Sequence, residues 1–242
     1  MTRAEDTGRP LGREFFMADS VDLAPVLLNK LMVTGDGRVG RIIEVEAYRG
    51  EEDPASHAYR GANARNQSMF GPPGHLYVYM SYGVHWCANV VCGVAGQARA
   101  VLLRALAPLC GLELMRAARW VAQRRQDDRD LCRGPGRLCQ ALGIDRSLDG
   151  YDLAGPGGRL WVATDGTPPP PAPLISTRVG ITAGSELPWR FMVDDPGVSR
   201  PVPLSPAHQG RSAASAVAGG LGRTGAGREA AGECLARPAG PC

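Results

Sequence analysis

Lysine and long apolar runs are almost absent from this 242-residue chain. Lys30 is the only lysine, so nearly all of the positive charge is carried by arginine. No run approaches the roughly 18 apolar residues that a membrane-spanning helix requires, and the first residues lack the apolar segment of a secretory signal. We therefore expect a cytoplasmic protein with no membrane contact.

The cysteines also lack a pattern. There are seven, an odd number, without CxxC spacing, and the chain has only four histidines. Paired spacing is the usual sign of a structural metal or a disulfide framework. We therefore expect reduced thiols that serve as small buried apolar residues, with no metal and no cofactor.

Acidic residues are missing from residues 54–112. The same stretch contains three histidines and four arginines, among them Arg60 and Arg65. A segment without carboxylates can approach a polyanion without repulsion. An apolar core would also lack charge, which accounts for much of residues 76–103 but not for the polar loop at residues 56–68. The stretch therefore favours nucleic acid as a partner, although the net charge of the chain is only +3.

Hydrophobic periodicity and turn residues predict a mixed order of elements. Ser20 is expected to cap a helix over residues 21–31, and Gly83 to join two strands at residues 75–82 and 84–91. Further strands are expected at 40–48, 99–105, 159–163, 176–181 and 190–193. Helices are expected from Pro108 and Gly111 towards residue 124, and at 137–142. This order indicates an α+β fold: a single compact domain with an antiparallel or mixed sheet, flanking helices and a protruding tyrosine hairpin.

Composition sets the expected domain boundaries. Residues 1–12 are predicted to be a flexible N-terminus and residues 13–203 the folded domain. Residues 204–242 are rich in Gly, Ala, Ser and Pro without periodicity, which is typical of a disordered tail.

Two carboxylates and a phenol share one face of the strand at residues 40–48. Because side chains alternate along a strand, Glu44, Glu46 and Tyr48 are expected on one face. Ile43, Val45 and Ala47 are expected on the other. A solvated outer face would show the same pattern. A histidine-containing loop and an aromatic hairpin follow, however, and a partly desolvated carboxylate near aromatic rings is a candidate general base.

The hairpin LYVYMSYG carries three tyrosines. Tyr77 and Tyr79 share a face, whereas Tyr82 has the opposite parity and lies at the turn. Cross-strand packing is one explanation. The other is functional: one tyrosine stacks on a ligand, and the tyrosine at the tip is a wedge that can enter a base stack.

Together these segments resemble the alkyladenine (3-methyladenine) DNA glycosylase family. The resemblance covers residues 13–200 and is carried in order by GRIIEVEAYRGEEDPASH, GHLYVYMSYGVHWCANVVC, VLLRALAPLCGLELM and LCRGPGRLCQALGI. The Gly-Pro-Gly in the last segment is superficially similar to helix-hairpin-helix glycosylases, but the four-cysteine cluster spacing of those enzymes is missing.

The resemblance implies a catalytic set for hydrolysis. Glu46 matches the family's general base, which activates the attacking water. Arg104 matches the arginine that helps to position this water, and the backbone carbonyl of Val179 matches a third water contact. Glu44, on the same strand face as Glu46, has no assigned role.

The resemblance also implies how a base is held. Tyr48, His57 and Tyr79 match the aromatic walls of a pocket for a flipped base. Asn89 matches the side chain that disfavours guanine, and Tyr82 matches the residue that intercalates from the minor groove in place of the extruded nucleotide.

Four residues are expected at the DNA backbone: Arg60, Arg65, Gly134 and Gly136. The two arginines lie in the acid-free segment. The glycines precede a helix whose free N–H groups could hold a phosphate, and a purely structural turn explains them equally well.

The expected function is therefore that of a monofunctional glycosylase, a monomer associated with the nucleoid, that acts on double-stranded DNA. Cationic 3-methyladenine leaves readily as a neutral base; 7-methylguanine, hypoxanthine and ethenoadenine are further candidates. Strand cleavage usually requires an amine, and Lys30 is the only side-chain candidate. Two alternatives remain open: a non-catalytic protein that binds damaged DNA, and a hydrolase or formyl-transfer enzyme for small molecules.

Overall fold

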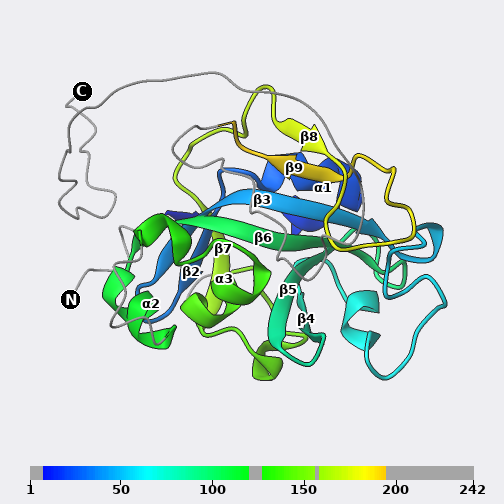
Figure 1. The fold of residues 1–242 in the computed structure, drawn as a ribbon, viewed down its shortest axis with the longest axis horizontal. Helices are drawn as coiled ribbons and strands as arrows, with labels where there is room; N and C mark the ends of the chain where they lie inside the picture. The colour runs from blue at the N-terminus through cyan, green and yellow to red at the C-terminus, as the bar shows by residue number, and fades with distance from the viewer. Residues whose placement is uncertain (1–7, 120–126, 156–157, 195–242) are drawn as a thin grey trace, which may run out of the picture.

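One antiparallel sheet of nine strands organises the computed structural model, which describes residues 8–119, 127–155 and 158–194. Seven strands follow one another across the sheet: β1 (Arg9–Pro10), β7 (Leu160–Thr164), β2 (Leu31–Thr34), β3 (Val39–Arg49), β6 (Arg99–Cys110), β5 (His85–Cys92) and β4 (Leu76–Ser81). β9 (Arg190–Met192) pairs with β3 and with β8 (Leu174–Ser176). In Figure 1, β3 and β6 cross the middle of the molecule and the β4–β5 hairpin lies below them, near the bottom centre.

Within the described ranges, three α-helices accompany the sheet: α1 (Ser20–Leu27), α2 (Leu112–Ala118) and α3 (Pro135–Leu142). α1 packs against β3 and β6, whereas α3 packs against β5, β6 and α2. Short 3-10 turns complete the described chain: η2 (Arg13–Phe16), η3 (Gly50–Glu52), η4 (Gln67–Phe70), η5 (Asp128–Asp130) and η6 (Arg146–Leu148). The elements form a single domain with a curled antiparallel sheet, which confirms the expected α+β class.

The two faces of the sheet have different neighbours. Leu76 and Val78 of β4 belong to the main core, together with leucines of α1 and α3. Tyr77, between them, projects to the opposite face and joins a smaller cluster with Ala58 and Met69. The alternation predicted for this strand is therefore confirmed, and its second face is available for a site.

The first helix differs from the prediction. Its N-cap is Asp19, not Ser20, because the Asp19 carboxylate accepts the Val21 N–H at 3.1 Å. The helix ends at Leu27 instead of Leu31, which begins β2. A buried four-residue strand with an apolar sequence has no periodicity that separates it from the end of a helix.

Other predicted boundaries also shift. Pro108 lies within β6, opposite Gly40, and does not open a helix. α2 begins after Gly111, which has a φ of +69°; its predicted continuation over 120–124 lies outside the described residues. The strand predicted at 176–181 is wrong beyond Ser176, where β8 ends.

The N-terminal boundary is affected as well. Arg9 and Pro10 pair with β7, so the sheet begins inside the segment predicted to be a flexible N-terminus. Residues 1–7 and the predicted tail at 204–242 lie outside the described residues, and these assignments stay predictions. Cys110 is disulfide-bonded, which contradicts the expectation of reduced thiols at this position. Among the described residues, the free cysteines are Cys87, Cys92, Cys132 and Cys139, and all four are buried.

Candidate active site

A row of paired residues brings distant parts of the sequence to one face of the sheet. From β4 to β9, the row consists of Tyr77, Asn89, Leu102, Glu46 and Arg190. Directly paired residues in antiparallel strands project their side chains from the same face. The fold therefore places Tyr77, Asn89 and Glu46 on a common surface, as the resemblance requires for Asn89 and Glu46.

Glu46 is fully buried (0% exposed), and both of its carboxylate oxygens are hydrogen-bonded. Oε1 accepts the backbone N–H of Val179 at 2.8 Å and lies 3.1 Å from Nη1 of Arg104. Oε2 accepts the hydroxyl of Tyr48 at 2.9 Å. A buried negative charge needs such partners. Val179 thus donates its N–H to Glu46. The predicted contact between the Val179 carbonyl and a water molecule stays a prediction.

Arg104 binds both carboxylates of the strand. Its Nε donates to Oε1 of Glu44 at 2.8 Å, while Nη1 reaches Glu46. Two compensating register shifts make this geometry: β3 has an extra residue at Ile43, and β6 has an extra residue at Arg104. Burial acts to lower the pKa of Arg104, but the negative charges of Glu46 and Glu44 raise it above its ordinary value. The guanidinium therefore remains a cation.

The bulge at Ile43 makes the predicted face of Ile43, Val45 and Ala47 wrong at its first residue. Ile42, and not Ile43, lies in the core with Val45 and Ala47, because the extra residue shifts the alternation by one position. Glu44 remains near Glu46 but faces a second cation, since Nε of Arg190 donates to it at 2.7 Å.

Tyr48 connects the carboxylate to an aromatic surface. Its ring centroid lies 4.6 Å from the guanidinium carbon of Arg178, whose side chain is paired with Asp53. Burial, together with the negative charge of Glu46, raises the pKa of Tyr48 far above its ordinary value. The hydroxyl therefore stays protonated and remains a donor. Arg178 and Asp53 were missed by the sequence analysis, because no local pattern links residues so far apart.

Three rings form a connected group beside Tyr48. The rings of His57 and Tyr79 meet edge-on with centroids 4.4 Å apart, and Tyr77 stacks on Tyr79 at 5.4 Å. Nδ1 of His57 lies 2.9 Å from the hydroxyl of Tyr77. Burial lowers the pKa of His57, with a smaller contribution from Arg65, and raises the pKa of Tyr77 to about 12. The rings are therefore neutral at pH 7; the role of Tyr77 beside His57 was not predicted.

Asn89 is buried beside this group, and its Nδ2 donates to the carbonyl of Tyr77 at 3.1 Å. The hydrogen bond ties the Asn89 amide to β4, which carries both Tyr77 and Tyr79. Its orientation is thereby fixed relative to the rings, as a residue that selects among bases would require.

The β4–β5 hairpin ends in an exposed aromatic residue. Tyr82 and Gly83 have φ angles of +50° and +69°, and the N–H of Val84 donates to the carbonyl of Ser81 at 2.9 Å. Positive φ at both central positions is what a type I′ turn requires. Tyr82 is 78% exposed, so its ring is free to contact a partner.

The residues predicted at the DNA backbone differ in their surroundings. Nη2 of Arg65 donates to the carbonyl of Met80 at 3.0 Å, whereas Arg60 is exposed. A Cβ on Gly136 would come within 2.7 Å of the ring of His85, and nothing lies within 4 Å of a Cβ on Gly134. Gly136 therefore has a packing role; a phosphate contact stays a prediction for all four residues.

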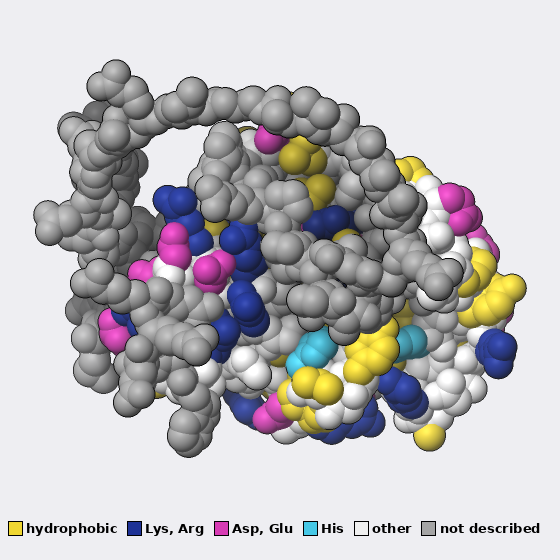
Figure 2. Space-filling model, in the orientation of Figure 1, with side chains coloured by type: hydrophobic (Ala, Val, Ile, Leu, Met, Phe, Trp, Pro, Cys, Tyr) yellow, Lys and Arg dark blue, Asp and Glu magenta, His cyan; other side chains and the backbone are white. Residues whose placement is uncertain are grey.

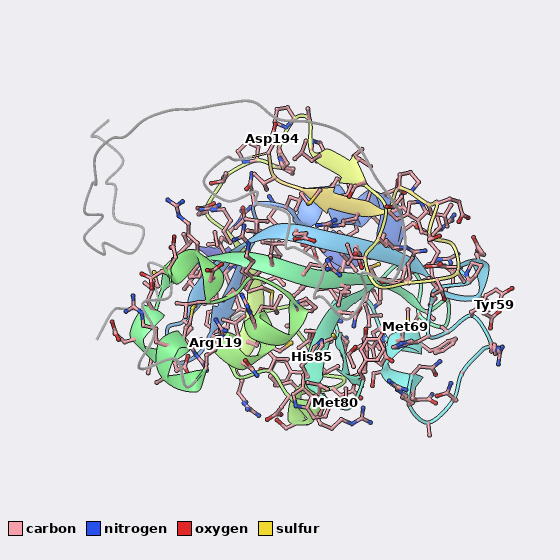
Figure 3. All side chains as sticks on the ribbon, viewed as in Figure 1. Tyr59, Met69, Met80, His85, Arg119 and Asp194 are labelled. Atoms are coloured by element: carbon pink, nitrogen blue, oxygen red, sulfur yellow. The ribbon has the colours of Figure 1, made fainter. Side chains whose placement is uncertain are left out.

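The surface around the hairpin combines several kinds of side chain. Figure 3 shows Met80 and His85 close together there, with Tyr59 on a loop at the right edge. In Figure 2, histidine and hydrophobic side chains lie side by side over this region, with Lys or Arg side chains near them. Such a surface suits a partner that has both flat rings and negative charge.

The described part of the chain contains neither a metal-binding cluster nor a membrane-spanning helix. There, no group of three or more His, Cys, Asp or Glu side chains is arranged to hold a metal ion. Of the helices in the described ranges, none combines the length and the hydropathy needed to cross a bilayer.

This face combines a buried carboxylate with a group of aromatic rings, and the hairpin that carries two of these rings ends in the exposed Tyr82. Such a combination suits an enzyme that acts on the bases of a nucleic acid. The comparisons with known proteins agree. The family model of methylpurine-DNA glycosylase (MPG) matches residues 14–196. The chain therefore belongs to the methylpurine-DNA glycosylase family and is a DNA glycosylase, an enzyme of DNA repair.

Relatives from distant bacteria share most of the chain, and those compared here are each named "Putative 3-methyladenine DNA glycosylase". The Burkholderia lata protein is 54% identical over 198 residues, which cover 81% of this chain and 93% of the relative. The Streptomyces avermitilis protein is 50% identical over 196 residues, with 78% and 91% covered. The Carboxydothermus hydrogenoformans protein is 45% identical over 185 residues, with 75% and 93% covered. The resemblance inferred from the sequence is confirmed, and membership of a family of DNA glycosylases disfavours both alternatives.

Proposed function

We propose that this protein flips alkylated purines out of duplex DNA and hydrolyses their N-glycosidic bond with a water molecule activated by Glu46. Cationic 3-methyladenine is the principal substrate of the proposal, followed by 7-methylguanine, hypoxanthine and ethenoadenine. The product is an abasic site in an intact strand. The observation that carries the proposal is the buried Glu46 carboxylate, which has two hydrogen-bond donors and the paired cation Arg104 beside an aromatic group.

The described partners of Glu46 leave an acceptor position for a water molecule. A carboxylate oxygen has about two acceptor positions. Oε1 accepts the Val179 N–H and is also paired with Arg104, whereas Oε2 has one described partner, Tyr48. Water bound at the second position of Oε2 would transfer a proton to Glu46 as its oxygen attacks C1′ of the deoxyribose. The C1′–N bond breaks, its electrons go to the base, and the carboxylate stabilises the positive charge that develops on the sugar.

The rings explain the preference for a damaged base. Alkylation at N3 or N7 makes the purine a cation, which then leaves as a neutral molecule without a strong general acid. A cation over an aromatic ring gains about 0.5–2 kcal/mol, and Tyr48 and Tyr79 are the proposed surfaces. His57 suits this site because its lowered pKa keeps it neutral at pH 7 and avoids repulsion.

Access to the base requires flipping, which costs a few kcal/mol and less at a damaged pair. The exposed ring of Tyr82 would enter the minor groove and fill the gap, offsetting part of this cost. Arg60 and Arg65 would contact the backbone. One domain contains every residue of the proposed site, so the proposed active form is a monomer.

The experiment compares wild type with Glu46→Gln on duplex DNA methylated with dimethyl sulfate. Glutamine keeps the size and one acceptor oxygen but cannot take the proton. General-base catalysis contributes roughly 10²–10⁴-fold, so free-base release measured by chromatography should fall at least 10²-fold. Equal release by both proteins would remove Glu46 from its role.

The matched control is Glu113→Gln, which makes the same change on an exposed face of α2. It should release bases at the wild-type rate. Binding of both variants to DNA with a tetrahydrofuran abasic analogue shows that they fold and recognise DNA.

A further inference from the structure

Asp53 and Arg178 form an ion pair whose two side chains are both 0% exposed. Nη1 of Arg178 lies 2.5 Å from Oδ2 of Asp53, and Nη2 donates to Oδ1 at 2.8 Å. Removing two charges from water is costly, and a buried pair is weak evidence for stability by itself. The contacts that Arg178 makes suggest why the buried pair is present.

The guanidinium of Arg178 lies against the strand that carries the proposed base. Nη1 also donates to the carbonyl of Ala47 at 3.0 Å, between Glu46 and Tyr48 in sequence. The guanidinium carbon lies 4.6 Å from the ring centroid of Tyr48 and 5.0 Å from that of Trp189. Arg178 thus fixes the position of the Tyr48 ring from a side that the hydroxyl contact with Glu46 does not use.

The same arginine anchors the residue that binds Glu46. Val179 follows Arg178 directly, and its N–H reaches Oε1 of Glu46 at 2.8 Å. Both residues belong to an irregular connection between β8 and β9, residues 177–189. Adjacent Cα atoms are only 3.8 Å apart, so anchoring the side chain of Arg178 confines the backbone of Val179.

We propose that Asp53 and Arg178 are positioning residues, which hold the Val179 N–H on Glu46 and the Tyr48 ring in place. Asp53 follows the same strand, β3, and its Oδ1 also accepts the N–H of Ala55 at 3.0 Å. The pair therefore connects the segment after β3, the strand that carries Glu46, to the β8–β9 connection, which carries Val179. The inference rests on the proposed role of Glu46 as the base.

The test uses Arg178→Lys in the full-length protein. Lysine keeps a cation for Asp53 but cannot donate to both Asp53 oxygens and the Ala47 carbonyl in one plane. With enzyme in excess over dimethyl sulfate-methylated duplex DNA, the single-turnover rate should fall about 10- to 100-fold, as expected for a small misplacement of a catalytic group. Affinity for abasic-analogue DNA should change less than about threefold, because no DNA contact is proposed for Arg178.

The matched control is Arg41→Lys. Arg41 lies on β3 and, like Arg178, forms a two-contact pair with a distant aspartate, Asp165, but it has no described contact with Glu46. Its rate should remain within about twofold of wild type. Amide hydrogen exchange at Val179 should accelerate in Arg178→Lys and not in Arg41→Lys. Asp53→Asn is a second variant for the same measurements.

A double-mutant cycle separates the inference from the proposed function. If Arg178 acts through Glu46, adding Arg178→Lys to Glu46→Gln should cost less than about threefold further. A full additional loss, or an unchanged rate in both Arg178→Lys and Asp53→Asn, would overturn the positioning role. Activity of Glu46→Gln equal to wild type would instead overturn the proposed function.

Discussion

Nη1 of Arg104 lies 3.1 Å from Oε1 of Glu46, and neither side chain is more than 11% exposed. Glu44 and Arg190 extend this contact to a cluster of two carboxylates and two guanidiniums. The formal charges of these four side chains balance. Removing one partner of a buried pair leaves an uncompensated charge, which costs more than the pair itself contributes.

The first prediction concerns Arg104→Met. It should lower the free energy of unfolding by about 3 kcal/mol and reduce base release at least tenfold, because Glu46 loses the cation that stabilises its charge. Urea unfolding and the methylated-DNA assay measure the two effects. The control is Arg146→Met, which removes the half-exposed arginine paired with Asp149. This change should lower the free energy of unfolding by less than about 1 kcal/mol. Equal urea midpoints for Arg104→Met and wild type would contradict this account of the cluster.

The second prediction concerns the hairpin tip. Tyr82→Asn removes the ring but keeps a residue that accepts the positive φ of this turn. Stability should change by less than about 0.5 kcal/mol. Stacking on a base is worth about 1–3 kcal/mol, so affinity for abasic-analogue duplex should fall about 10-fold or more. The control is Tyr59→Asn, on the loop at the right edge of Figure 3. The intercalation proposal fails if both variants bind the abasic-analogue duplex like wild type.

Local patterns in the sequence predicted much of the frame of this site. Alternation identified β3, β4 and β5, and Gly83 marked the turn between β4 and β5. Both patterns depend only on residues that are neighbours in the sequence. Alternation also marked Glu46 as a candidate base, but Asn89 and Arg104 were found only through the family resemblance, which related them to Glu46.

What remained hidden depends on distant parts of the chain. The bulge at Ile43 exists only because β3 pairs with β6 in a shifted register. The pairing of Asp53 with Arg178 spans 125 positions. Neither leaves a periodic signal, and both determine how Glu46 is held.

The third prediction concerns pH. The hydrogen bond from Arg41 holds the pKa of Asp165 well below its usual value, against the opposing effect of burial. Because the folded-state pKa is lowered, this carboxylate contributes stability above the unfolded pKa of about 4 and loses it as the pH falls through the folded value. Asp165→Asn should therefore lower the free energy of unfolding by about 1 kcal/mol at pH 7, and the difference from wild type should shrink below about pH 4. A difference that stays constant from pH 7 to pH 3 would contradict the assignment.

The fourth prediction concerns the fate of the DNA strand. Lys30 lies outside α1, although the helix predicted over residues 21–31 included it. It is buried, and its Nζ lies 3.4 Å from the carbonyl of Thr167. Burial lowers its pKa, and Arg41 is a charged neighbour. Arg41 precedes Glu46 by five positions along β3, a distance of about 16 Å. Lys30 is therefore remote from the proposed site, and no Schiff base with the sugar should form.

Lys30→Arg should release bases like wild type, and both should leave abasic sites that break only after alkali treatment. Strand cleavage or borohydride-trapped protein–DNA adducts that persist in Lys30→Arg with a blocked N-terminal amine would disprove the monofunctional mechanism.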